Sequence, residues 1–263
     1  MLDLGSETLV VTHDAMAEGI HYLTGQDPAD VAWKLVASNL SDLAAKGSEP
    51  LGVLLGYQFG ADDNRFLEGL GEVLAHYGVP LLGGDTIGAA GAQVLGLTAL
   101  GRATHCPVPS RSGAQVGDAL WITGPVGAAM LGFEALRDGS GADSTAFRRP
   151  SALLAEGWAL APLVTAMMDV SDGLLLDASR MANASGVSFA IDGAAVPIAT
   201  PETRRAEALR WGEDYQLLFT LPAGAEPPVR AFEIGKASAA GEAPIMLDGM
   251  ALPKTDGLGY EHR

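Results

Sequence analysis

Isolated acidic residues stand at the ends of the predicted strands and helices, and this arrangement constrains the fold more than any other feature of the sequence. They occur in short segments of small residues, which are Thr12-His13-Asp14, Asn39 to Asp42, Gly83-Gly84-Asp85, Asp169 to Asp172 and Gly212-Glu213-Asp214. Carboxylates are rare in apolar surroundings unless they are paired or bound to a metal. Several of these have no Lys or Arg beside them in the sequence. We therefore interpret them as ligands of a hard cation, most economically Mg²⁺, which shares its shell with phosphate when few carboxylates hold it.

The first part of the chain alternates between predicted strands and helices. Asp27-Pro28 predicts a helix start, because an acid at the N-cap and a proline in the first turn both favour one. Apolar periodicity continues this helix to about Lys46 and places Asn39 and Asp42 on one face. The other elements expected here are a strand over 8–12 leading to Asp14, strands over 50–59 and 93–104, a helix over 63–76, and a strand over 79–82 ending at Gly-Gly-Asp85.

A change in composition near Cys106 marks the predicted domain boundary, between residues 105 and 106. The pattern then restarts, and the tail from Pro222 carries only weak, short strand-like signals. The elements expected in this second half are strands over 118–123, 187–191 and 215–221 and helices over 126–137, from about 151, and over 172–185.

Composition limits the classes of function. The 263 residues carry 16 basic and 32 acidic side chains, for a formal charge of −16. That balance argues against nucleic acid as a partner, because such binding depends on Lys and Arg neutralising phosphates. The single cysteine, Cys106, excludes an intramolecular disulfide and fits a reducing compartment. The most apolar stretch, 151–170, is interrupted by Glu156 and Pro162. We therefore expect a cytoplasmic protein that binds neither nucleic acid nor membrane.

The sequence lacks the usual loops that bind a nucleoside triphosphate. No G-x-x-x-x-G-K-[ST] segment occurs, nor a G-x-G-x-x-G after a strand, nor a protein-kinase catalytic loop. A bound triphosphate would therefore have to be held largely through metal ions. The carboxylates available for this are Asp14, Asp42, Asp85, Asp169 and Asp172.

Taken singly, each candidate residue has an ordinary structural alternative. Asp172 could cap the helix after it, Asp42 could be a solvated helix residue, and Asp14 and Asp85 could be turn acids. His21 could be purely structural, and Arg111 could be solvated rather than hold a phosphate by forked hydrogen bonds. Glu213 and Asp214 could be loop residues or contacts to a cationic part of a substrate. The recurrence of acids at corresponding ends of elements in both halves favours the functional interpretation.

Taken together, these residues resemble those of thiamine-monophosphate kinases, members of the superfamily of aminoimidazole-ribonucleotide synthetase and selenophosphate synthetase. The segments that carry the resemblance run in order along nearly the whole chain. They are VVTHDAMAEGIHYL, VAWKLVASNLSDLAAKGSEPLGVLLGY, LLGGDTIG, SRSGAQVGDALWITG, MDVSDGLLLDASRMA, WGEDYQLLFT and GYEH. The helix segment with Asn39 and Asp42 and the segment MDVSDGL are the most specific.

The resemblance implies ATP-dependent phosphorylation of thiamine monophosphate to thiamine diphosphate, by direct in-line transfer without a phosphoenzyme. It implies an α+β fold of two domains, a sheet-and-helix domain over 1–105 and an α/β sandwich over 106–263, paired as a homodimer through the N-terminal halves with the nucleotide in the joint groove. The implied catalytic residues are Asp172 and Asp42. The implied Mg²⁺ positions are Thr12, His13, Asp14, Asp42, Asp85, Asp169 and Asp172; the ATP contacts are Gly84, Asp85, Arg111 and Ser171; the substrate contacts are His21, Glu213 and Tyr260.

The sequence departs from the family pattern at two places, and the second leads to an expectation about the start of the chain. His13 stands where the family more often has Thr, and imidazole is a less natural Mg²⁺ ligand than oxygen, although the backbone carbonyl could serve. The family's Gly-Asp-Asp-Ala-Ala segment, whose acid also binds metal, has no counterpart before Met1-Leu-Asp-Leu-Gly. We expect the native protein to have some tens of additional residues there, and activity without them could be low.

Two other interpretations remain at this stage. A sister synthetase of the same superfamily is disfavoured, because a selenophosphate synthetase would want a reactive Cys near the N-terminus and Cys106 lies at mid-chain. The segment WGEDY and the context of His21 disfavour a ribonucleotide synthetase. A chain that binds nucleotide or thiamine phosphates without turnover is the other alternative, and only product formation separates it from a kinase.

Overall fold

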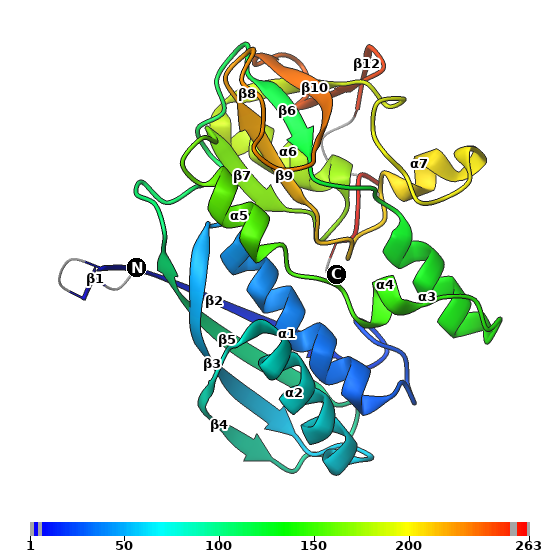
Figure 1. Cartoon of the computed structure of the whole chain (residues 1–263). Helices are drawn as coiled ribbons and strands as arrows, with labels where there is room; N and C mark the ends of the chain where they lie inside the picture. Colours follow the sequence, from blue (N-terminus) through cyan, green and yellow to red (C-terminus); the bar gives the residue numbers. More distant parts are fainter. Residues whose placement is uncertain (1–2, 5–6, 253–256, 262–263) are drawn as a thin grey trace.

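The chain folds around two mixed β-sheets, one in each half (Figure 1). A computed structural model describes residues 3–4, 7–252 and 257–261. In spatial order, the first sheet consists of β1 (Asp3–Leu4), β2 (Glu7–Ala17), β5 (Val94–Ala103), β3 (Ser48–Gln58) and β4 (Leu81–Ile87). The second consists of β12 (Met250–Ala251), β11 (Ile245–Leu247), β8 (Val187–Ile191), β10 (Phe232–Ala239), β6 (Ala119–Ile122), β9 (Leu217–Leu221) and β7 (Ala166–Asp169). This is the two-domain α+β architecture that the resemblance implied.

Helix α1 (Pro28–Ala44) joins the two halves. It begins as predicted, with the Asp27 side chain accepting a hydrogen bond from the Ala29 N–H at 3.0 Å. It packs on the first sheet beside α2 (Asp63–Tyr77) (Figure 1), and it also contacts α4 (Thr145–Arg148), α5 (Leu154–Leu160) and β7 of the second half. Nearly all of its residues are buried as a result. An apolar core continuous with parts of both halves surrounds this helix.

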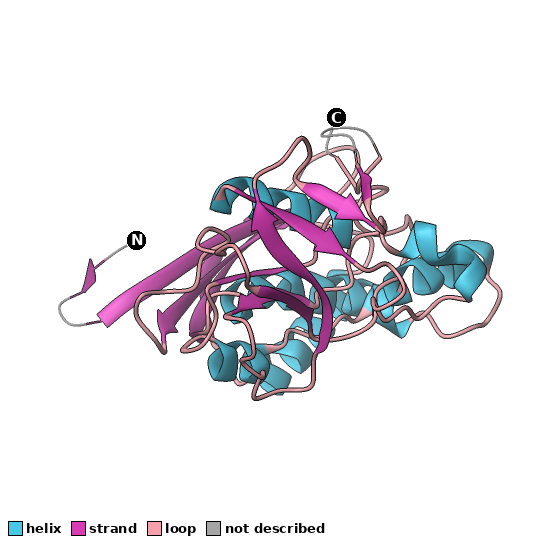
Figure 2. Cartoon of the chain, turned by 90° about the horizontal axis from the view of Figure 1, so that it is seen from above, coloured by secondary structure: helices cyan, strands magenta, loops and turns pink. Residues whose placement is uncertain are grey.

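The first sheet has one covered face and one open face. Helices α1 and α2 cover the first, which carries buried residues such as Val53 and Leu97. The other face, which we call the open face, exposes Val11, Leu54 and Ile87. Every residue of β4 is exposed, at the edge of the sheet. Both views show the N-terminal end of β2 projecting beyond the rest of the molecule (Figures 1 and 2).

The second sheet packs against α6 (Leu174–Ser185), whose buried residues form a second core with Phe189 and Leu218. The remaining helices of the described second half are α3 (Ala128–Asp138), α7 (Arg205–Ala208) and a 3₁₀ turn at Glu202–Arg204. No helix within residues 3–4, 7–252 and 257–261 has the length and apolarity needed to cross a membrane.

Most predicted elements are confirmed within a few residues, and four were wrong in extent. The strand expected over 8–12 continues to Ala17, so Asp14 lies inside β2 rather than after it. The strand expected over 79–82 continues to Ile87, so Gly84 and Asp85 lie inside β4 and pair with Leu55 and Gly56 of β3. The helical pattern from 151 ends at Leu160, and β7 follows, because 166–169 pair with β9 in the buried sheet. Helix α6 begins at Leu174, with Gly173 at its N-cap. Asp172 is therefore not the cap of that helix.

Candidate active site

A cavity of about 580 Å³ brings residues of both halves together. Its lining includes most of the side chains that the sequence singled out: Asp14, His21, Asp42, Asp169, Ser171, Asp172, Glu213 and Tyr260. They come from β2 and the loop after it, α1, the end of β7, the loops before α6 and β9, and the C-terminal segment. Residues that are far apart in the sequence thus meet in one cavity, and we therefore take this cavity as the candidate active site.

The carboxylates Asp14, Asp42 and Asp169, which we call the acidic wall, are positioned by α1. The Asn39 side chain accepts a hydrogen bond from the Asp14 N–H at 3.0 Å and is itself anchored to the helix through the Leu35 carbonyl. The Ser41 hydroxyl donates to Asp169 Oδ2 at 2.7 Å. Asp42 accepts a hydrogen bond from the hydroxyl of Thr12 on β2. One turn of helix thus ties together carboxylates from three elements.

The pKa values of the acidic wall show how close these carboxylates are. Burial and then the charge of Asp42 raise the pKa of Asp169 to about 8. Loss of hydration and then the charge of Asp42 raise the pKa of Asp14 to about 6. The pKa of Asp42 is raised by burial, although Thr12, Lys46 and Arg111 oppose the shift. Like charges that raise one another's pKa favour either protonation or a cation between them.

The acidic wall fits a divalent cation whose shell a ligand completes. Within residues 3–4, 7–252 and 257–261, no three His, Cys, Asp or Glu side chains are close enough to form a ready-made metal site. Mg²⁺ is commonly held by one or two carboxylates together with substrate phosphates and water. One or two of Asp14, Asp42 and Asp169 would be its ligands here. The nearby cations Lys46 and Arg111 offset the charge of Asp42 only in part, because its pKa is still raised.

Asp172 lies in a tightly packed loop before α6. Its carboxylate pairs with Arg180, two turns along that helix, and Arg180 also contacts Asp177 at 2.8 Å. Buried Asp177 accepts hydrogen bonds from the N–H groups of Ser171 and Asp172, at 3.1 and 2.9 Å. Asp172 therefore has a basic partner that its sequence neighbours did not reveal. A side chain at Gly173 or Gly212 would collide with the facing backbone, at 2.5 Å from Arg210 O and 2.3 Å from Ser171 O.

Glu213 and His21 share a partner that the sequence did not single out. Lys34 of α1 forms an ion pair with Glu213 at 2.8 Å and donates to the His21 carbonyl at 2.7 Å. The His21 ring accepts a hydrogen bond from the Ala17 N–H through Nδ1, at 3.0 Å. Glu213 has φ 67° and Tyr215 φ 50°, left-handed conformations that are uncommon for residues with side chains.

Aromatic side chains form a further part of the cavity, which we call the aromatic wall: Phe133, Phe147 and Trp211. The ring of Phe133 lies 5.3 Å from the rings of both Phe147 and Trp211. Tyr260 also lines the cavity, 45% exposed, and its N–H donates to the Asp172 carbonyl at 2.8 Å. The aromatic wall was missed because its residues come from α3, α4 and a loop, with no shared spacing in the sequence.

Other predicted residues are not part of this cavity lining. His13 and Asp85 lie on the open face of the first sheet, since Asp85 shares a cross-strand row with Gly56, Gly96 and Ala15, and His13 pairs with Thr98. The His13 ring contacts the Thr98 hydroxyl at 2.9 Å. Gly84 is on β4, three strands from β2, which is roughly 14 Å at ordinary strand spacing. Thr12 and exposed Arg111 are not in the lining, but the Thr12 hydroxyl donates to Asp42 and the charge of Arg111 lowers the Asp42 pKa.

Comparison with known proteins identifies the family. Residues 1–103 match the model of AIR synthase related protein, N-terminal domain, and residues 115–242 match its C-terminal domain. The chain is 37% identical to the thiamine-monophosphate kinase of Escherichia coli K12 over 238 residues, covering 82% of this chain and 72% of that protein. This chain belongs to the thiamine-monophosphate kinase family. A second member, from Leptospira interrogans, is 31% identical over 284 residues, with 98% of this chain and 91% of that protein covered.

Solved structures of family members have the same fold. A structure described as AaThiL complexed with AMPPCP and TMP superposes with a TM-score of 0.86 at 28% identity, covering 96% of this chain and 88% of that one. The kinase from Stenotrophomonas maltophilia gives a TM-score of 0.85 at 29% identity, with 94% and 87% covered. Hydrogenase maturation proteins at about 19% identity share the fold alone. The two kinase structures agree with membership of the kinase family.

Proposed function

We propose that this chain transfers the γ-phosphoryl group of ATP to thiamine monophosphate, yielding thiamine diphosphate and ADP. The observation that carries the proposal is one cavity lined by both the acidic wall and the aromatic wall. Family membership and a relative whose structure was obtained with AMPPCP and TMP support it. Phosphates need countercharge, which cations held by the acidic wall would supply, and a heteroaromatic substrate needs an apolar surface, which the aromatic wall offers.

Mg²⁺ held at Asp14, Asp42, Asp169 and Asp172 would supply the countercharge that phosphoryl transfer requires. The acceptor oxygen belongs to a phosphate that is already ionised near neutral pH, so no side chain has to remove a proton from it. The bond from the γ-phosphorus to the leaving ADP oxygen breaks as the bond to the acceptor oxygen forms. The protein's part is therefore to align the two phosphates, with Asp42 and Asp172 as the residues on which the reaction depends most.

The substrate's rings fit the other part of the cavity. The thiazolium ring is cationic, and aromatic faces attract cations. The aromatic wall and Tyr260 offer such faces, while Glu213 offers an opposite charge. His21 also lines the cavity, and its carbonyl accepts a hydrogen bond from Lys34. We assign Glu213, His21 and Tyr260 to the substrate, as the resemblance implies.

We propose that a second copy of the chain covers the open face and completes the nucleotide site. The open face carries exposed apolar residues, including Val11 and Leu54, and β4 is exposed along its whole length. His13 and Asp85, both implied as metal ligands, lie on this face rather than in the cavity. A dimer formed through it would place Gly84 and Asp85 in a groove shared by two chains, where ATP also meets Arg111 and Ser171.

The proposal also includes the position of the domain boundary and the cellular compartment. We place the domain boundary between residues 105 and 106, because the described strands of the two sheets fall on either side of it. We assign the protein to the cytoplasm, because its one cysteine, Cys106, is exposed and forms no disulfide bond. A reducing compartment preserves such a thiol.

The decisive experiment is an assay of thiamine diphosphate formation from ATP and thiamine monophosphate by this 263-residue chain, with Mg²⁺ and then with EDTA. We expect Mg²⁺-dependent product and equal amounts of ADP. Binding of both substrates without product would identify a non-catalytic binder. ADP release without thiamine diphosphate would direct attention to a different acceptor, as in a sister synthetase.

A further inference from the structure

Lys34 is a deeply enclosed basic residue beside the cavity. Its side chain is 1% exposed, although it lies on a helix whose neighbouring residues are mostly apolar. A buried ammonium group is costly unless its hydrogen-bonding capacity and its charge are both satisfied. Burial lowers the pKa of Lys34, and the charge of Glu213 opposes that shift. The enclosure therefore requires an explanation in terms of what the ammonium group contacts.

The Lys34 ammonium group contacts three residues of the cavity lining, whereas Lys34 itself is not in that lining. Its Nζ lies 2.8 Å from Glu213 Oε1 and 2.7 Å from the His21 carbonyl oxygen. The same atom lies 3.5 Å from the centre of the Phe147 ring. His21, Phe147 and Glu213 each line the cavity. The Lys34 ammonium group therefore contacts the loop after β2 in the first half, and α4 and the loop before β9 in the second half.

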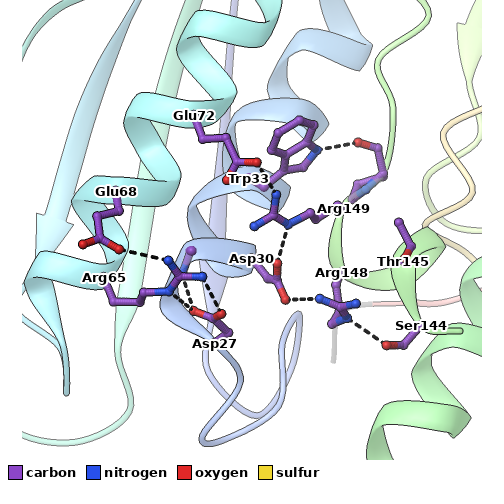
Figure 3. A network of polar contacts seen from close by, with 12 residues as sticks. Asp27, Asp30, Trp33, Arg65, Glu68, Glu72, Ser144, Thr145, Arg148 and Arg149 are labelled. Carbon is purple, nitrogen blue, oxygen red and sulfur yellow. Dashed lines mark hydrogen bonds and ion pairs between the residues drawn. The ribbon is translucent and has the colours of Figure 1, made fainter. Parts of the chain in front are cut away.

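The neighbouring residues of α1 hold the same region. Asp30, one turn before Lys34, pairs with Arg148 and Arg149, which follow Phe147 directly (Figure 3). Trp33 Nε1 donates to the Pro150 carbonyl at 3.0 Å. These contacts fix the backbone on one side of Phe147. They leave the orientation of Glu213, which is 22% exposed, to the ion pair with Lys34.

The backbone around Glu213 makes that ion pair important. Glu213 and Tyr215 both have left-handed φ values, of 67° and 50°, and such conformations persist only where the surroundings impose them. The Glu213 N–H donates to the Ser171 carbonyl at 2.8 Å, and the Tyr215 N–H donates to Val170 O at 2.9 Å. Lys34 holds the side chain, while these hydrogen bonds hold the backbone.

We propose that Lys34 is a positioning residue, whose ammonium group orients Glu213, the His21 carbonyl and the Phe147 ring for the thiamine moiety of the substrate. This inference rests on the proposed function, because it assigns these residues to the thiamine side of the site. Lys34 contacts neither the acidic wall nor any residue assigned to ATP. Its loss should therefore affect the two substrates unequally.

The test compares Lys34→Met, which keeps the length but removes the charge, with Glu213→Gln and with the double variant. Kinetics are measured with each substrate varied in turn. We expect Lys34→Met to lower kcat/KM for thiamine monophosphate by about 100-fold, the scale of a misplaced binding group, with the KM for ATP changed by less than about twofold. The double variant should lose less than the product of the single losses, because the two residues act as a pair. Equal losses for both substrates, or multiplicative losses, would overturn the proposal.

A control and a second variant keep the test decisive. Arg65→Met removes an ion pair with Asp27 at the start of α1, outside the cavity lining, and should leave both KM values unchanged (Figure 3). Lys34→Gln keeps a donor for the His21 carbonyl and replaces Lys34→Met if that variant does not fold.

Crystal structures separate this inference from the proposed function. If the wild-type chain makes no thiamine diphosphate, the proposed function fails, and the structures of wild type and Lys34→Gln still test the role of Lys34. We expect the Glu213 carboxylate to leave the cavity in the variant. A Glu213 side chain that keeps its wild-type position without Lys34 would refute the positioning role.

Discussion

The acidic wall and the aromatic wall line the same cavity but are built in different ways. The acidic wall is held by side-chain hydrogen bonds from α1, through Asn39 and Ser41 and from Thr12 to Asp42, and its charges are only partly compensated. The aromatic wall is held by ring packing among Phe133, Phe147 and Trp211. The first arrangement stores unbalanced negative charge, and the second offers a surface without charge. The difference supports our proposal that the metal and phosphates bind at one part and the organic rings at the other.

Helix α1 shows how one element serves both walls. Its C-terminal half carries Asn39, Ser41 and Asp42 to the acidic wall, and its N-terminal half carries Lys34 to Phe147 of the aromatic wall. Because this helix is buried between the two halves, its turns are fixed relative to both. Substitutions at different turns of one helix should therefore separate the two functions of the cavity.

The largest effect is expected from breaking the acidic wall at Asp42. Asp42→Asn removes the negative charge and keeps the shape, so we expect kcat to fall by about 1,000-fold, roughly 4 kcal/mol of transition-state stabilisation. Binding of thiamine monophosphate, followed by the fluorescence of Trp211 and the other tryptophans, should change little. Turnover is measured at saturating Mg²⁺ and ATP.

Asp62→Asn is the matched control for Asp42→Asn. Asp62 caps α2 by accepting from the Arg65 N–H at 3.0 Å, and it lies outside the cavity lining. We expect it to cost some stability without changing kcat. If Asp42→Asn keeps near-wild-type turnover, Asp42 does not bind the metal.

A smaller effect, on stability, is expected at Asp214, which contacts the start of the helix that carries Phe133 of the aromatic wall. Asp214 accepts hydrogen bonds from the N–H groups of Gly127 and Ala129, at 2.6 and 3.0 Å, and so caps α3, the helix of Phe133. Burial raises the pKa of Asp214 to about 6, although these backbone groups oppose the shift. The folded state therefore binds this proton more tightly than the unfolded state. Its stabilising contribution is complete below about pH 4, the unfolded value, and is lost as the pH rises through about 6.

Asp214→Asn removes this titration, so the test is the difference in unfolding free energy between wild type and variant across pH 4 to 7. We expect that difference to move in favour of the wild type by about 2–3 kcal/mol as the pH falls, which is the scale of a two-unit pKa shift. Denaturant unfolding at each pH measures it. A difference that is constant with pH would show that Asp214 titrates alike in both states.

The sequence predicted the acidic wall because carboxylates among small and apolar residues are unusual enough to be noticed singly. Asp14, Asp42 and Asp169 were found in this way, and the structure brings them together. The position of Asp85 inside β4 was missed, since Gly-Gly-Asp is typical of a turn and only pairing with β3 extends the strand. Lys34 and the aromatic wall were missed for the opposite reason. A lysine or phenylalanine on a helix is ordinary, and its meaning depends on partners far away in the sequence.

The smallest effect is expected within the aromatic wall itself. Phe133→Leu keeps an apolar side chain but removes a ring that lies 5.3 Å from both Phe147 and Trp211. Aromatic pairs contribute about 0.5–1.5 kcal/mol beyond the area they bury, which corresponds to a KM for thiamine monophosphate raised by about two- to tenfold. The KM for ATP and kcat should stay near wild type, because Phe133 has no contact with the acidic wall.

Phe232→Leu provides the matched comparison, since Phe232 is also half-buried but lies on β10, outside the cavity lining. Phe232→Leu should lower the melting temperature by about as much as Phe133→Leu does, without changing the KM for either substrate. A rise in the KM for ATP equal to that for thiamine monophosphate would mean that the two walls do not divide the substrates between them. A selective rise in Phe133→Leu, set beside the loss of kcat in Asp42→Asn, would establish that division with one substitution in each wall.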